Sequence, residues 1–282
     1  MVQTLQKAVS EAALILSEAG IDGARRDASL LLANILDADT SIFHLEPERV
    51  LTDAHYVMFQ HAVERRASRE PISHILGHRE FWSLDFLVGP QVLDPRPDSE
   101  TLIETALSAQ KSGQEITSIL DLGTGSGCLL LSLLSEVETA RGLGVDQSLA
   151  AIEIAEQNAK RLSLDDRATF LQGNWCDGLE DKFDLVISNP PYIPIDDIEN
   201  LQPEVKNFEP LAALVGGADG FDCYREIISA VKPIMKPYGM IIFEVGAGQA
   251  QEVSELLKKA DFSKVSRHKD LASIERCVSA FF

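Results

Sequence analysis

The segment ISNPPYIP sets an amide side chain, two prolines and an aromatic ring in a row, Asn189-Pro190-Pro191-Tyr192, directly after an apolar run that predicts a strand over 183–188. A planar NH2 group is a poor nucleophile because its lone pair is delocalised, so a site that uses it must hold both of its N–H bonds. The Asn189 side-chain oxygen and the Pro190 carbonyl could accept them, while Tyr192 stacks on the plane. The motif predicts a clamp for a planar nitrogen; a rigid turn is the alternative.

A glycine-rich loop, DLGTGSG at 121–127, lies between an apolar run that predicts a strand and another that predicts a helix. Glycines let the backbone turn sharply and let a ligand approach main-chain atoms, which indicates a nucleotide-type cofactor. A dinucleotide fingerprint would need glycine or alanine where this chain has Cys128. The G-x-G-x-G spacing is instead common in methyltransferases, so nicotinamide binding becomes the second interpretation.

Asp146 ends the next predicted strand, GLGVD, roughly 20 residues after the glycine loop. At that distance an acidic side chain accepts hydrogen bonds from both hydroxyls of a cofactor ribose, although it could also cap the following helix. Together the loop, the acid and the clamp predict transfer of a methyl group, because the clamp would align the nitrogen with the methyl carbon. No strong base is needed, since the proton becomes acidic as the methyl arrives.

Strands and helices alternate through the second part of the chain, which predicts right-handed βαβ units and a mostly parallel sheet with both faces covered. Two further strands are expected at the carboxyl terminus. The expected strands are 116–121, 142–146, 168–172, 183–188 and 239–245, and the expected helices are 99–110, 127–137, 148–162, 222–235 and 249–260.

Residues 3–69 show a helical pattern, with apolar residues at the 3.6 period, Gly20 as a C-cap and Thr52 as an N-cap. A β-like run and Pro95-Arg96-Pro97 follow. We therefore expect an N-terminal helical domain that recognises the substrate (1–70), a hairpin linker (71–98) and a catalytic domain (99–282).

The composition excludes several function classes. A formal net charge of −19 over 282 residues argues against direct nucleic-acid binding. No apolar run could cross a membrane, and the scattered cysteines and histidines indicate no metal site or disulfide framework, so a cytoplasmic protein is expected. The arginines 65, 66, 69 and 79 are more typical of a solvated helix face than of a docking patch.

Nearly the whole chain resembles the bacterial peptide chain release factor N5-glutamine methyltransferase family, also called the HemK family. The resemblance implies a small helical domain, a β-hairpin linker and a Rossmann-like class I S-adenosylmethionine-dependent methyltransferase domain with a reversed last strand. The matching segments are EPISHILGHREFWSLDF (70–86), VLDPRPDSE (92–100), DLGTGSG, GVDQSLAAIEIAEQNAKRL, GNWCDGL (173–179), ISNPPYIP, FEP, LVGGADGFDCYREII and FEVGAGQ (243–249).

Such proteins methylate the glutamine of the GGQ motif in class 1 release factors, using S-adenosyl-L-methionine and releasing S-adenosyl-L-homocysteine. The resemblance implies that Asn189, Pro190, Pro191 and Tyr192 hold the substrate glutamine. It implies cofactor contacts for Gly123, Thr124, Gly125, Ser126, Gly127, Asp146, Trp175 and Asn189, with Trp175 along the adenine.

The departures from the family pattern are small. Asp94 stands where an apolar or hydroxyl residue is common, and Asp98-Ser99 stands where Glu-Thr is common. Neither belongs to the motifs above that carry the chemistry. We expect these departures to affect the contacts of the linker and to leave the cofactor site unchanged.

Two other functions remain open from the sequence. A nucleic-acid methyltransferase of the adenine N6 type uses a similar clamp on a planar NH2 group, but it would be expected to show a basic track, which the charge of −19 opposes. A non-catalytic nucleotide-binding adaptor could keep the same fold, yet it would have no need of the clamp at 189–192.

Overall fold

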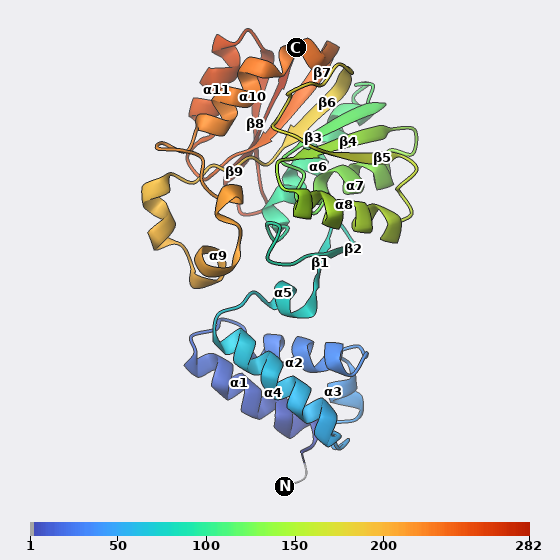
Figure 1. Ribbon diagram of the computed structural model, residues 1–282, viewed down its shortest axis with the longest axis vertical. Coiled ribbons are helices and arrows are strands. Elements are labelled where there is room, and N and C mark those ends of the chain that lie inside the picture. The colour runs from blue at the N-terminus through green and yellow to red at the C-terminus, as the bar shows by residue number, and fades with distance from the viewer. Residues whose placement is uncertain (1–2) are drawn as a thin grey trace. The chain divides into compact units, whose positions relative to one another are not determined.

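The computed structural model describes residues 3–282, and the chain divides into two compact units. The first unit comprises the described residues up to His78 together with Gln202–Phe208, and the second comprises Arg79–Leu201 and Glu209–Phe282. The first unit is helical, and its elements can be followed in Figure 1. Its helices are α1 (Leu5–Glu18), α2 (Ala24–Ile35), α3 (Ile42–Leu45), α4 (Asp53–Ala67), α5 (Ile72–Leu76) and α9 (Pro203–Phe208).

Helices α1 and α4 begin at threonine caps. The hydroxyl of Thr4 accepts a hydrogen bond from the backbone of Lys7 at 3.4 Å, and that of Thr52 accepts one from His55 at 3.2 Å. Each bond satisfies a backbone N–H that the first helical turn leaves without an internal partner. Gly20 follows α1 with a φ of +73°, so both boundary signals seen in the sequence are present.

One member of the arginine cluster is buried, contrary to the expectation of a solvated face. Arg66 is only 7% exposed. Its guanidinium contacts Asp27 at 2.8 Å and Glu204 at 3.2 Å, and Arg69 contacts Glu204 at 2.8 Å. A buried cation needs such partners because it has lost its hydration. The expectation was wrong for Arg66 because both partners lie far from it in the sequence.

The second unit is built on a seven-stranded sheet with the order β5-β4-β3-β6-β7-β9-β8. Neighbouring strands from β5 to β7 are parallel, and β9 is antiparallel to both of its neighbours. The mostly parallel sheet with a reversed last strand is therefore confirmed. The strands are β3 (Ser118–Leu122), β4 (Arg141–Asp146), β5 (Ala168–Gln172), β6 (Phe183–Ser188), β7 (Met235–Glu244), β8 (Ser263–Lys269) and β9 (Glu275–Phe281).

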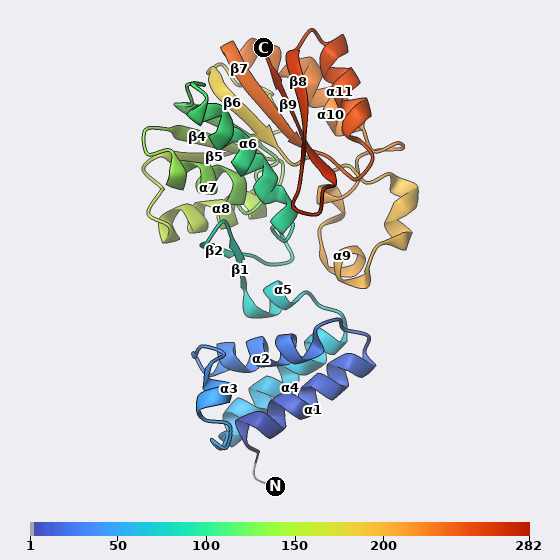
Figure 2. The ribbon, with the colours of Figure 1, turned by 180° about the vertical axis from the view of Figure 1, so that it is seen from behind.

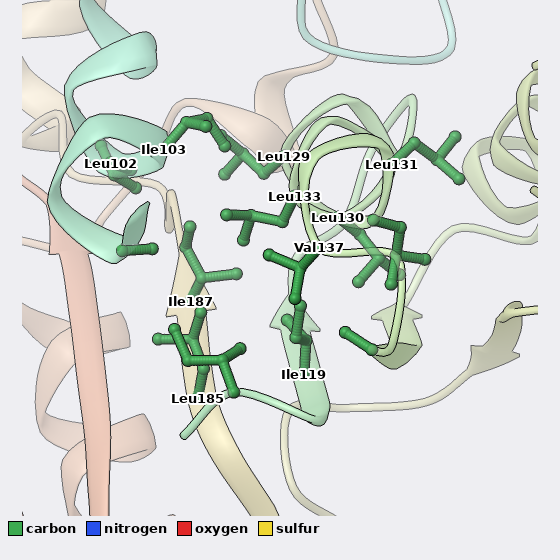
Figure 3. Close-up of a cluster of buried hydrophobic side chains, with 14 of the residues drawn as sticks. Leu102, Ile103, Ile119, Leu129, Leu130, Leu131, Leu133, Val137, Leu185 and Ile187 are labelled. Atoms are coloured by element: carbon green, nitrogen blue, oxygen red, sulfur yellow. The ribbon is translucent and has the colours of Figure 1, made fainter. Parts of the chain in front are cut away.

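Alternate side chains of the central strands enter two separate cores, as the two-residue period of a strand requires. On β6, Ile187 packs on one face with α6 (Glu100–Lys111), α7 (Cys128–Glu136) and α8 (Leu149–Arg161), and Val186 packs on the other with α10 (Asp222–Ala230) and α11 (Ala250–Lys259). Figures 1 and 2 show the sheet and its helices from opposite sides. Figure 3 shows Leu129 and Leu133 of α7 in the first core, with Ile119 of β3 nearby.

The pairing register brings the carboxyl ends of four strands to one edge of the sheet. Leu122 pairs with Val145 on one side and with Ser188 on the other, and Ser188 pairs with Phe243. The residues that follow these positions therefore lie along the same edge, although the chain visits them at widely separated points.

A β-hairpin precedes the sheet in the chain, in agreement with the expected hairpin. It consists of β1 (His78–Phe81) and β2 (Leu84–Leu87). The two turn residues between them, Trp82 and Ser83, have φ angles of +52° and +58°. Positive φ at both central residues matches the twist of the strands in a two-residue hairpin.

The helix expected over 222–235 is shorter in the structure. Helix α10 ends at Ala230, and a short 3-10 turn, η4 (Lys232–Ile234), precedes β7. Pro233 explains the difference, because it has no N–H to continue the helical bonding and its ring collides with the preceding turn. Among the helices of residues 3–282, none has the length and apolar character to span a bilayer.

Candidate active site

A cavity of about 390 Å³ lies at the carboxyl ends of β3, β4 and β6. This volume falls within the range of roughly 300–1,000 Å³ that small-molecule sites occupy. Most of the residues singled out in the sequence meet in its walls, whereas Gly127, Pro190 and Tyr192 are not among the lining residues. The expected site residues that line it are Gly123, Thr124, Gly125, Ser126, Asp146, Trp175, Asn189 and Pro191.

The glycine loop needs its glycines for two different reasons. Gly123, Gly125 and Gly127 have φ angles of +73°, +54° and +79°, in the left-handed region that other residues rarely adopt. At Gly127, a side chain would also come within 3.2 Å of Ala155 and Leu131. Gly127 therefore allows close helix packing behind the loop, while Gly123 and Gly125 open the backbone to the cavity.

Asp146 joins the end of β4 to the glycine loop. One carboxylate oxygen accepts a hydrogen bond from the Gly125 N–H, and the other accepts one from the Ser148 N–H, both at 2.9 Å. An ionised carboxylate has about four acceptor positions, so each oxygen keeps one for a further donor. Two neighbouring hydroxyls of a ribose would suit these free positions.

Trp175 forms another part of the wall. A side chain at Gly123 would lie 3.5 Å from its ring, so the loop and the indole are in close contact. The indole N–H donates to Glu226 at 3.0 Å, which fixes the ring in place. The half-buried ring gives the cavity a flat apolar surface of the kind on which a planar base stacks.

Asn189 follows β6 directly and is half-buried in the cavity wall. Its side-chain nitrogen lies 3.5 Å from the hydroxyl of Ser99. The loop beyond it is held through Tyr192, whose backbone carbonyl accepts a hydrogen bond from the Gln249 side chain at 2.9 Å. The Tyr192 ring also lies close to the backbone at Gly246, where a side chain would come within 3.0 Å of it.

Pro190 is buried, and Tyr192 is half-buried. Burial raises the pKa of the Tyr192 hydroxyl well above its usual range, so this side chain stays neutral. A neutral ring presents its face for stacking without a competing charge. Two expected roles toward a substrate stay predictions: acceptance of an N–H bond by the Pro190 carbonyl and stacking by the Tyr192 ring.

One buried carboxylate near the cavity, Asp121, was not assigned from the sequence. Asp121 is fully buried at the end of β3, where one oxygen accepts a hydrogen bond from the Thr124 hydroxyl at 2.7 Å. Among the described residues the other oxygen has no hydrogen-bond partner. Burial, reinforced by the neighbouring Asp146 charge, raises the pKa of Asp121 to about 7. Its place in the DLGTGSG motif is the signal that could have identified it.

Ser99 also reaches the site, which corrects the expectation that the departures from the family pattern affect the linker alone. Ser99 lines the cavity, is 3% exposed and contacts Asn189. Its hydroxyl donates to Glu244 at 2.5 Å. The expectation was wrong because Ser99 and Asn189 are distant in sequence and meet only when β6 and the start of α6 pack in the same unit.

The chemistry of the lining fits S-adenosylmethionine. Asp146 lines the cavity and offers acceptor oxygens at the glycine loop, which suits the hydroxyls of a ribose. Asp121 is fully buried beside the loop and is not among the lining residues. Arg96 lines the cavity, and its guanidinium is paired with Glu209 at 2.5 Å. The two phosphates of a nicotinamide dinucleotide would meet these carboxylates unfavourably. Within the described chain, no group of three or more His, Cys, Asp or Glu side chains could hold a metal ion.

Comparisons with known proteins agree with this geometry. Residues 7–77 match the family model described as the PrmC N-terminal domain, and residues 113–275 match a methyltransferase domain. The chain is 44% identical to the release factor glutamine methyltransferase of Rhodospirillum rubrum, over 94% of this chain and 81% of that protein. It is 41% identical to the protein of the same name from Caulobacter vibrioides, over 99% and 96%.

A solved structure supports the fold of the catalytic unit. A methyltransferase from Pyrococcus furiosus is 17% identical and superposes with a TM-score of 0.52, covering 70% of this chain and 88% of that one. At this identity the likeness concerns the fold alone.

Proposed function

The chain belongs to the release factor glutamine methyltransferase family, and from this premise we propose that it methylates the side-chain amide nitrogen (N5) of a glutamine in a class 1 peptide chain release factor. The glutamine is that of the GGQ motif, the methyl donor is S-adenosyl-L-methionine and the product is S-adenosyl-L-homocysteine. The reaction would take place in the cytoplasm, where release factors work.

The observation that carries the proposal is the position of Asn189. It directly follows β6 and lies in the wall of the same cavity that the glycine loop and Asp146 line. A nitrogen held by Asn189 would therefore lie beside a cofactor bound on the loop. This proximity matters because alignment of two reactants removes a large entropic part of the barrier.

The methyl donor, when bound, supplies an electrophilic carbon attached to sulfur. The side-chain oxygen of Asn189 and the carbonyl of Pro190 would accept the two N–H bonds of the glutamine amide, and Tyr192 would stack on its plane. Such a clamp favours the pyramidal nitrogen that forms during transfer over the planar amide of the ground state. The nitrogen would become positively charged as it gains the methyl group and would then release a proton to solvent, so no strong base has to act first.

The two alternative functions are less well supported. A nucleic-acid methyltransferase would have to bind phosphates despite a net charge of −19, and the relatives named above are release factor glutamine methyltransferases. A non-catalytic adaptor would bind the cofactor without turnover. Both can be distinguished from the proposed function in one experiment.

The protein is incubated with methyl-labelled S-adenosylmethionine and a class 1 release factor, and in parallel with a release factor whose GGQ glutamine is replaced by alanine. Mass spectrometry then locates the label. We expect one methyl group on the glutamine side chain and none on the variant. Label on another residue, label on added RNA or DNA, or cofactor binding without any transfer would refute the proposal.

A further inference from the structure

Asn189 is the first of three side chains connected by hydrogen bonds. Its side-chain nitrogen contacts the Ser99 hydroxyl at 3.5 Å, and that hydroxyl donates to the Glu244 carboxylate at 2.5 Å. Ser99 and Glu244 are 3% and 2% exposed. Neither has a part in the clamp described above, so the two buried groups behind Asn189 need another explanation.

A carboxamide can present either its oxygen or its NH2 group to a neighbour, and only one of the two orientations leaves an acceptor for the substrate. The Ser99 hydroxyl has a single proton. An ionised Glu244 can only accept, so it takes that proton, and the Ser99 oxygen is left as an acceptor. Asn189 must then turn its NH2 group toward Ser99 and its oxygen away from it.

We propose that Ser99 and Glu244 are positioning residues that hold the Asn189 carboxamide with its oxygen available to the substrate nitrogen. The inference rests on the proposed function, because it assigns a role within that reaction. It also explains the burial of Glu244. A charge without water is costly unless a donor of fixed geometry satisfies it, and Ser99 is such a donor.

Protonation of Glu244 would reverse the direction of the hydrogen bonds. A neutral carboxyl can donate to the Ser99 oxygen, which frees the hydroxyl proton to attract the Asn189 oxygen away from the substrate. Burial raises the pKa of Glu244 to about 7, against the opposing effects of Ser99, Arg276 and Arg96. The ionisable groups around Glu244 are Arg96 and Asp98 before α6, Cys128 of α7, Tyr192 after β6, Tyr224 of α10, and Arg276 and Cys277 of β9.

The sign of the pH effect follows from this arrangement. The productive orientation needs the ionised carboxylate, so the rate of methyl transfer should rise with pH through the neutral range as Glu244 loses its proton. The rise of the rate with pH would disappear if Glu244 could not titrate. If Glu244 only filled space, the transfer rate would not depend on its protonation.

The test compares the unaltered chain with Ser99→Ala, Ser99→Thr and Glu244→Gln. The transfer rate is measured at saturating cofactor and release factor from pH 6 to 8, with cofactor affinity and thermal stability measured in parallel. We expect Ser99→Ala to lower the rate about tenfold, the effect of one lost hydrogen bond, and Ser99→Thr to restore it. In Glu244→Gln the rise with pH should vanish. Ser254→Ala, another buried serine whose hydroxyl bonds to the Ala250 carbonyl, is the matched control.

A double variant shows whether the effect passes through the amide. If Ser99 acts by orienting Asn189, Ser99→Ala should not lower the rate further once Asn189 is alanine. If the two residues act independently, the two losses in rate should add. Additive losses, or a Ser99→Ala protein with the rate and pH profile of the unaltered chain, would overturn the inference.

One measurement is independent of turnover. The side-chain NH2 resonances of Asn189 are followed by NMR as the pH is raised, without substrate. They should titrate in the unaltered protein and stay constant in Glu244→Gln. If they titrate while no release factor is methylated, the proposed function is wrong, although Ser99 and Glu244 still orient the Asn189 amide. If release factor is methylated and they do not titrate, the positioning role is wrong.

Discussion

The buried carboxylates at the two ends of the central strands have pKa values shifted in opposite directions. Where β6 begins, one oxygen of Asp184 accepts hydrogen bonds from the backbone and hydroxyl groups of Thr117 and Ser118 and from the Lys236 ammonium, at 2.8 to 3.0 Å. Burial alone would raise the pKa of Asp184, but these donors outweigh it and lower the pKa to about 2. All of these donors to the Asp184 oxygen belong to the protein itself.

At the other end, where β3 and β7 finish, burial raises the pKa of Asp121 and of Glu244 to about 7. Asp121 keeps an oxygen without a partner in the described part of the chain. A carboxylate with many donors stabilises the sheet in its ionised form, whereas a buried carboxylate with few donors keeps capacity for a proton. The two ends of the sheet therefore differ in how their acids are bonded, and we expect only the end at the cavity to take part in the proposed reaction. Four substitutions can test this expectation.

The largest effect is expected for Asn189→Ala at the functional end. In the proposed clamp Asn189 is a preorganised polar group at the reacting atoms, and loss of such a group lowers rates by about 10²–10³-fold. The transfer rate should fall by this amount while cofactor affinity, measured by calorimetry, changes far less. Asn200→Ala removes an exposed asparagine beyond the same loop and should leave the rate unchanged. Near-normal transfer by Asn189→Ala would contradict the clamp.

Asp146→Ala should weaken cofactor binding by about 1–3 kcal/mol, because it removes charged hydrogen bonds to the ligand and the acceptor that holds the Gly125 backbone. The dissociation constant for S-adenosylmethionine is the measurement. Asp177→Ala, at an exposed position, is the control. An unchanged constant in Asp146→Ala would exclude the ribose role.

Asp184→Asn should affect stability and leave the chemistry intact. The lowered pKa corresponds to about 2 kcal/mol of folding free energy at neutral pH. This contribution is complete above the unfolded-state pKa near 4 and is lost as the pH falls toward about 2. Denaturant unfolding should therefore show a constant difference from the unaltered chain between pH 5 and 8 and a shrinking one below pH 4.

Asp181→Asn, on the exposed segment just before β6, is the matched control for that measurement. It should change neither the unfolding free energy nor its pH dependence. If Asp184→Asn lowered the transfer rate of fully folded protein, the division between the two ends of the sheet would fail.

The smallest effect is expected for Trp175→Leu. Loss of the flat ring beside Gly123 should weaken cofactor binding by about 0.5–1.5 kcal/mol, the contribution of one aromatic stacking contact. Trp175→Phe keeps a ring and should retain most of the affinity. Trp82→Leu, at the hairpin turn, should leave the dissociation constant unchanged, and an equal loss there would exclude a specific role for Trp175.

Most of the residues that we expect to bind the cofactor could be found from the sequence, because the signals that mark them are local. The glycines of the loop and the strand before it are contiguous in the chain, and Asp146 ends the neighbouring parallel strand. The hydrophobic period and the spacing of special residues are sufficient to locate such a site. The reversed β9 followed from the family resemblance.

The amino-acid sequence by itself determined the order of elements, the glycine loop and the position of Asn189 after a buried strand, because each depends on neighbouring residues. Only the tertiary structure decided that Ser99 and Glu244 meet behind Asn189, and that Asp27 and Glu204 surround Arg66. These contacts join residues far apart in the chain. Their existence depends on strand register and helix packing, which no local pattern encodes.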